Sequence, residues 1–139
     1  MGVRPQLQAL MLADHIYVDA ATGKKIIAGA FNRLSSKEFP STAGVSKYTL
    51  ISLTDVHGTV SLILRFVDLS TGDTLLEMQG LEVHADNPLD TVEMILEIPP
   101  LPLPHPGTYA LEVYSDNDMI GVLRVFADAQ AENESEANQ

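Results

Sequence analysis

Hydrophobic and polar residues alternate along most of the chain with the period of two that is typical of β-strands. The clearest case is residues 91–98, where four apolar side chains share one parity while Glu93 and Glu97 share the other. About eight segments have this character, and turn-forming residues separate them. They are residues 8–19, 25–34, 47–55, 59–69, 74–84, 91–98, 108–115 and 119–126. This spacing predicts an all-β fold, a two-layer antiparallel β-sandwich of immunoglobulin-like type.

Three of the expected strands contain irregular positions. In residues 8–19, Asp14 falls among apolar residues of one parity, which favours a bulge or a bend there over a regular ladder. Residues 25–34 are rich in small side chains, which suggests that a neighbouring backbone approaches closely. Residues 74–84 form a weaker strand with room for a bulge near Gly80.

The last third of the chain is dominated by prolines followed by a hairpin. Five prolines between residues 99 and 106 remove backbone donors, so this stretch is expected to be extended and cannot be a central strand. We expect it to cross between the two sheets and to bury Leu101 and Leu103; a polyproline II ligand for an SH3-like partner is the alternative. The turn residues Asp116, Asn117 and Asp118 then join two alternating strands.

Two stretches of sequence suggest a family. ADHIYVDAATGKKIIAGAFNRL, with its I-x-G-x-F strand at residues 27–31, and PGTYALEVYSDNDMIG, with its P-G-x-Y hairpin, resemble an uncharacterised family of small bacterial β-sandwich domains. The resemblance covers about residues 10–127 and implies a fold but no activity. The second stretch also looks like the Gly-x-Tyr feature of immunoglobulin-like sandwiches, which implies that the Tyr109 hydroxyl bonds back to the chain. The cysteine pair and the tryptophan of antibody domains are missing.

Length and charge narrow the picture further. A chain of 139 residues fits one domain, assigned to residues 1–127, and the acidic tail 128–139 has no large apolar side chain and is expected to be disordered. The net charge of −11 should repel nucleic acid and anionic membrane surfaces. The absence of cysteine and of any recognisable signal or membrane-spanning segment predicts a cytoplasmic protein.

Candidate chemistry in the sequence is sparse. The four histidines lie on different elements, no nucleophile or phosphate-loop motif is present, and no cofactor is expected. Asp116 and Asp118 are weak candidates for a calcium site at one end of the sandwich, although a hairpin turn explains both residues without a metal. The sequence therefore predicts a protein that is not an enzyme.

The predicted role is a protein-interaction or structural module, with a protein partner or self-association, and a homodimer is possible. Two strands carry apolar residues on both faces, so Ile63, Val67 and Ile26 are predicted to contact a partner, unless loop 35–46 covers them. Two alternatives remain: a calcium-assisted ligand- or lipid-binding sandwich, and a hydrolase whose site is assembled from scattered His and Asp residues.

Overall fold

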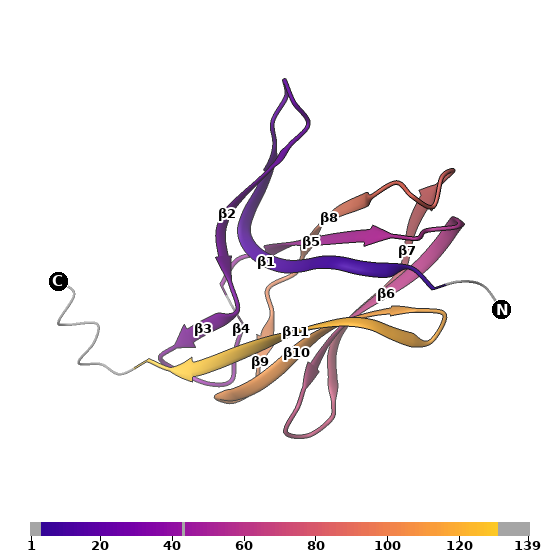
Figure 1. Ribbon diagram of the computed structural model, residues 1–139. Helices are drawn as coiled ribbons and strands as arrows, with labels where there is room; N and C mark the ends of the chain where they lie inside the picture. Colours follow the sequence, from indigo (N-terminus) through magenta and orange to yellow (C-terminus); the bar gives the residue numbers. More distant parts are fainter. Residues whose placement is uncertain (1–3, 43, 131–139) are drawn as a thin grey trace.

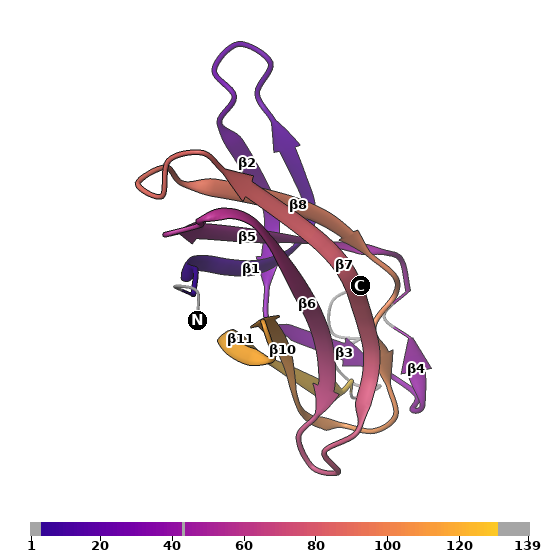
Figure 2. The same cartoon turned by 90° about the vertical axis from the view of Figure 1, so that its right-hand side faces the viewer.

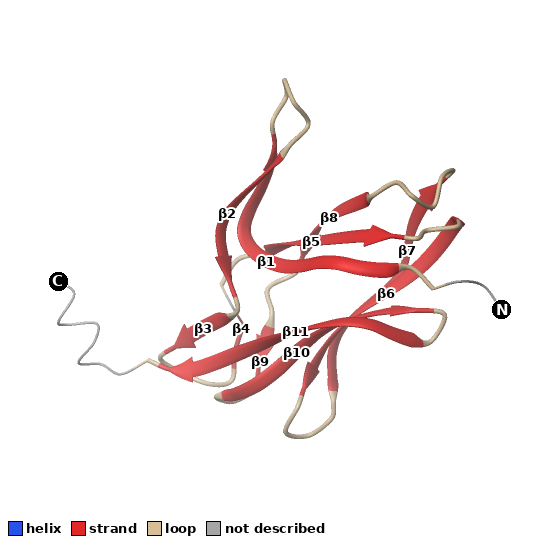
Figure 3. Cartoon of the chain, viewed as in Figure 1, coloured by secondary structure: helices blue, strands red, loops and turns tan. Residues whose placement is uncertain are grey.

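The computed structural model describes residues 4–42 and 44–130, and within these residues it contains eleven β-strands and no helix (Figure 3). The strands are β1 (Gln6–Val18), β2 (Lys25–Phe31), β3 (Arg33–Ser36), β4 (Ser41–Thr42), β5 (Lys47–Thr54), β6 (Gly58–Asp68), β7 (Thr74–Ala85), β8 (Val92–Ile98), β9 (Pro102–Leu103), β10 (Gly107–Ser115) and β11 (Asp118–Ala129). No helix in the described part of the chain is long and apolar enough to cross a membrane.

The strands form two facing sheets (Figures 1 and 2). The first has the order β2-β1-β5-β8 and the second β3-β11-β10-β6-β7, while β4 and β9 make a separate two-stranded ladder. In immunoglobulin terms β1, β5 and β8 take the places of strands A, B and E, and β6, β10 and β11 those of C, F and G, with β7 as C′. The predicted all-β, immunoglobulin-like sandwich is therefore confirmed, with eleven strands among the described residues in place of about eight.

The extra strands are short, and one of them corrects the sequence prediction. Residues 25–34 were expected to form a single strand, but the chain changes sheets at Asn32, so that β2 lies in one sheet and β3 in the other. β3 runs parallel to β11, and the Phe126 N–H donates to the Asn32 carbonyl oxygen at 2.8 Å. A period-two pattern cannot reveal such a change, because it continues through both strands.

The irregular positions are largely where the sequence placed them. The pairing of β6 with β7 shifts register next to Gly80, as predicted. Gly80 has a φ of 73°, which glycine adopts without strain. The proline-rich stretch crosses between the sheets, as predicted, and Leu101 and Leu103 are both buried. The register shift in β1 lies between Leu7 and Ala9, away from Asp14.

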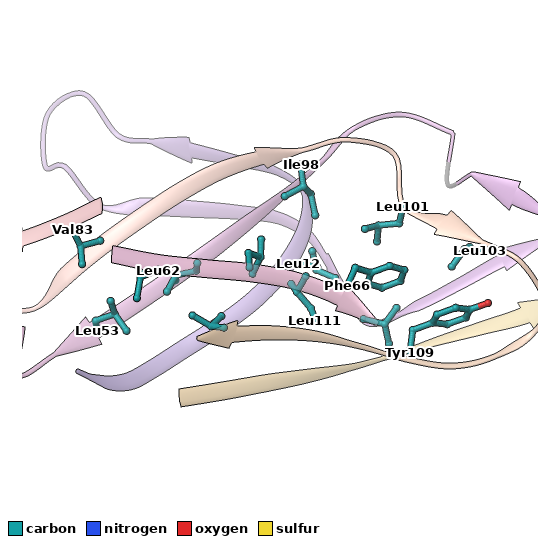
Figure 4. Close-up of a cluster of buried hydrophobic side chains, with 14 of the residues drawn as sticks. Leu12, Leu53, Leu62, Phe66, Val83, Ile98, Leu101, Leu103, Tyr109 and Leu111 are labelled. Atoms are coloured by element: carbon teal, nitrogen blue, oxygen red, sulfur yellow. The ribbon is translucent and has the colours of Figure 1, made fainter. Parts of the chain in front are cut away.

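The core fills the space between the two sheets (Figure 4). Inward residues of both layers make one apolar cluster, to which the proline-rich crossing contributes as well. Its largest fully buried side chains are Tyr109, Phe66, Leu12, Ile51, Leu53, Leu62, Ile98, Leu101, Leu103 and Leu111. The Phe66 and Tyr109 rings stack with centroids 5.3 Å apart, so Tyr109 is part of the core.

The bend expected near Asp14 is real and it shapes the molecule. β1 pairs with β5 as far as Ala13, then leaves the sheet and continues with β2 as a projecting hairpin (Figure 1). Gly29 on the partner strand has a φ of 73°, a backbone conformation that favours glycine, and a Cβ there would also lie 2.5 Å from Asp14 Oδ2. The Lys25 Nζ lies 2.9 Å from Glu93 Oε1 on β8, and this ion pair holds the hairpin to the far edge of the same sheet.

The C-terminal boundary of the domain differs from the prediction. β11 continues to Ala129, and the Gln130 N–H donates to the Ser36 carbonyl oxygen at 2.8 Å. Asp128 belongs to this strand, and its carboxylate forms an ion pair with Arg33 at 2.5 Å. The sandwich therefore extends past residue 127, because β3 offers these residues a backbone partner. The remaining tail, 131–139, lies outside the described residues.

Candidate functional site

The outer face of the first sheet carries an open hollow at the foot of the projecting hairpin. Tyr48 on β5 lies directly opposite Ala13 on one side and Glu97 of β8 on the other, so the three side chains share one face. His15 follows Ala13 by two residues and faces the same way. The hollow has a volume of about 610 Å³, and it is lined by Asp14, His15, Val45, Ser46, Tyr48, Glu97 and Pro100.

The aromatic side chains in this hollow touch one another but leave their polar atoms unused. The His15 ring lies 5.3 Å from the ring of Tyr48 and 5.5 Å from that of Tyr17, centroid to centroid. Within the described residues, no hydrogen bond is found for the His15 ring nitrogens or for either tyrosine hydroxyl, and Glu97 has no ion-pair partner. None of the described residues therefore occupies these groups.

The apolar surface continues from the hollow along the hairpin. Tyr17 lies directly opposite Ile26, and each side chain remains 52% exposed. Val18, the next residue of the strand, is exposed on the other face of the hairpin. Large apolar side chains grouped on a projecting element are typical of a surface that contacts another molecule.

A second cluster of polar groups lies at the corner between β9 and β10, and every part of it is occupied. The Asp68 side chain, only 3% exposed, accepts from the Ser70 hydroxyl at 2.8 Å and from His105 Nε2 at 2.6 Å. His105 Nδ1 donates to the Pro106 carbonyl oxygen at 2.7 Å. The Tyr109 hydroxyl donates to the His105 carbonyl oxygen at 2.5 Å, which is the tyrosine corner of immunoglobulin-like sandwiches.

The charges in this corner support each other. The bond to the Pro106 carbonyl, and then the bond to Asp68, raise the pKa of His105 above its ordinary value. Burial acts to raise the pKa of Asp68, but hydrogen bonds from Ser70 and His105 outweigh it and hold that pKa below its usual range. Because both ring nitrogens face acceptors, this geometry favours the doubly protonated ring of His105 beside the Asp68 carboxylate.

The corner contains Ser, His and Asp, but their arrangement differs from a catalytic triad. In a triad the serine and the aspartate bond to different ring nitrogens, so that the histidine can take the serine proton. Here both Ser70 and Asp68 contact Nε2 of His105, and Nδ1 is occupied by Pro106. Ser70 thus has no base, and the cluster serves to anchor the corner.

The residues that the sequence singled out are not brought together. Asp116 and Asn117 have φ values of 50° and 69° and form the β10–β11 turn, while Asp118 pairs with Arg4 at 3.7 Å. Asp68, the most deeply buried carboxylate of the second sheet, lies at the other end of β10, opposite Tyr109. No group of three or more His, Cys, Asp or Glu side chains that could hold a metal occurs among the described residues.

The three predicted contact residues lie on two different surfaces. Ile26 is on the hairpin of the first sheet, whereas Ile63 and Val67 are on β6, in the middle of the second. Val67 is buried, and Ile63 is half-buried opposite Tyr114. Sequence reasoning missed Tyr48 and Glu97 as a pair because they meet only through strand pairing; the signal within reach was His15 and Tyr17, two residues apart on one face.

Comparison with known proteins shows the family to which the chain belongs. It belongs to the family of unknown function DUF6941, whose sequence model matches residues 8–126. This confirms the resemblance to an uncharacterised family. No curated protein matches the chain. A solved immunoglobulin-like protein from Pseudomonas aeruginosa is similar in structure, with 10% sequence identity and a TM-score of 0.47, over 90% of this chain and 97% of that one.

Proposed function

We propose that this protein is a non-enzymatic interaction module that binds a partner protein on the outer face of the sheet β2-β1-β5-β8. The observation that carries the proposal is the pair Tyr17 and Ile26, half exposed on a hairpin that the Lys25–Glu93 ion pair holds in place. An exposed tyrosine beside an aliphatic side chain has the composition of a binding hot spot.

The opposite face of the molecule is a weaker candidate. On the second sheet Arg65 lies 4.6 Å above the Tyr114 ring and forms an ion pair with Glu77 at 2.6 Å, so polar groups cover the neighbourhood of Ile63. A surface whose side chains are already paired with each other gains less from a partner than one whose groups are free.

A photo-crosslinking amino acid in place of Tyr17 tests the proposal in the native host. We expect one protein, or a second copy of this chain, to be crosslinked from position 17 and to be lost when Ile26 is changed to Glu. The same amino acid in place of Glu82, an exposed residue of β7, serves as the control. Equal products from both positions, or none from position 17, would contradict the proposal.

A further inference from the structure

Resting on this proposed function, we infer that the hollow between His15, Tyr48 and Glu97 receives a lysine or arginine side chain of the partner. The first support is the charge of the hollow. Of its two carboxylates, Asp14 is already paired with Lys47 at 3.0 Å, whereas Glu97 forms no ion pair within the described residues. Glu93, four residues earlier on β8, is paired with Lys25.

The second support is the pair of aromatic rings beside that carboxylate. A cation held over a tyrosine face gains from the ring quadrupole, and it gains more where an anion lies close by. Tyr48 is directly opposite Glu97, and His15 packs at a tilt of 31° against the Tyr48 ring. The hollow thus presents a ring beside a hydroxyl and a carboxylate for which the described part of the chain supplies no partner.

The second sheet of the molecule combines the same three kinds of group, with the cation on the strand between the other two. On the second sheet the Arg65 guanidinium lies over the Tyr114 ring and pairs with Glu77 directly opposite on β7. Tyrosine, carboxylate and cation are all present there. In the hollow of the first sheet the tyrosine and the carboxylate are present, and the cation is the component that a partner would supply.

Long-range charge and size agree with this occupant. The net charge of −11 attracts cationic segments and repels anionic ones. A hollow of about 610 Å³ lies within the range of pockets that take small ligands, so it accommodates one long side chain with part of its backbone. A phosphate, a nucleic acid or an acidic peptide would face the Glu97 carboxylate, and of the basic residues only His15 lines the hollow.

The test uses a short acetylated Gly-Gly-Arg-Gly-Gly amide and the same peptide with citrulline, which has the shape of arginine without its charge. Titration into the labelled full-length protein, followed by NMR, should shift the Tyr48, His15 and Glu97 resonances with the arginine peptide. Binding of the citrulline peptide should be weaker by about fivefold or more. Equal binding of both peptides would overturn the inference.

A matched pair of variants locates the effect. Glu97→Gln should weaken arginine-peptide binding by about fivefold, whereas Glu82→Gln, the same charge change on an exposed residue of the other sheet, should leave it unchanged. If Glu97→Gln binds the arginine peptide as wild type does, the inference is wrong. Crosslinking from position 17 distinguishes the two proposals. If the peptide test fails but the crosslinked product still forms, the arginine-binding inference is wrong and the interaction module is still supported. If no product forms from position 17 without the Glu97→Gln change, both proposals are wrong.

Discussion

Two histidine–tyrosine pairs in this molecule have nearly the same ring geometry and opposite surroundings. His105 and Tyr109 lie 5.6 Å apart at a tilt of 29°, and His15 and Tyr48 lie 5.3 Å apart at 31°. In the first pair both ring nitrogens and the hydroxyl are bonded to the protein. In the second pair none of these atoms has a partner among the described residues. The contrast indicates that the first pair maintains the fold, and it supports the proposal that the second takes part in binding.

The largest effect should come from the first pair. Tyr109 is fully buried, so Tyr109→Ala removes a core ring and its corner bond and should cost about 3–5 kcal/mol of unfolding free energy. Tyr48→Ala, the matching change in the second pair, should cost clearly less because that ring is only half-buried. Urea unfolding measures both. A cost below about 1 kcal/mol at Tyr109 would remove the distinction between the two pairs.

The two outer faces should also differ in stability. Ile63→Glu places a charge on a half-buried position beside Tyr114 and should lower the unfolding free energy by about 2 kcal/mol. Ile26→Glu, on the exposed hairpin, should change it by less than about 0.5 kcal/mol. Thermal unfolding of the two variants compares them. An Ile26→Glu variant that unfolds as easily as the Ile63→Glu variant would mean that the hairpin face is part of the core. Light scattering at tens of micromolar then shows whether either substitution alters the mass of the protein in solution.

The corner pair should make stability depend on pH. Folding raises the pKa of His105, so its stabilising contribution is complete below the unfolded value of about 6.5 and is lost as the pH rises through the folded pKa. Folding lowers the pKa of Asp68, so its contribution is present above about 3.9 and is lost as the pH falls. The melting temperature should therefore decline from pH 6 to pH 8.

Two histidine variants test whether His105 causes the decline in melting temperature. His105→Gln should flatten the pH dependence between pH 6 and pH 8, whereas His57→Gln, in an exposed turn, should keep the wild-type slope. Calorimetric scans at several pH values measure both. If His105→Gln keeps the full slope, His105 and Asp68 do not form the ion pair on which the description of the corner depends.

The smallest effect is expected at the C-terminus. Removal of residues 131–139 should change the unfolding free energy by less than about 0.5 kcal/mol. Removal from Ala127 onward should cost clearly more, because Ala127 is buried and pairs with Leu34 of β3. Melting temperatures of the two truncated proteins compare them. Equal melting temperatures would show that β3 and the end of β11 contribute nothing to the sandwich.

The sequence predicted the sandwich because alternation and turn residues are local signals. The same holds for Tyr109 and for the buried Leu101 and Leu103, whose positions follow from nearby prolines and strand parity. The change of sheets at Asn32 depends on a partner strand at the other end of the chain, so no local pattern reveals it. The proposed site was missed for the same reason: Tyr48 and Glu97 meet only when β5 pairs with β8.

The most direct test of the central contrast observes both tyrosines in one experiment. When the arginine peptide is titrated into the wild-type protein, the ring resonances of Tyr48 should move progressively while those of Tyr109 stay in place. The account predicts this difference because one ring faces an open hollow and the other is enclosed in the core. A Tyr48 signal that does not respond, or a Tyr109 signal that moves equally, would contradict it.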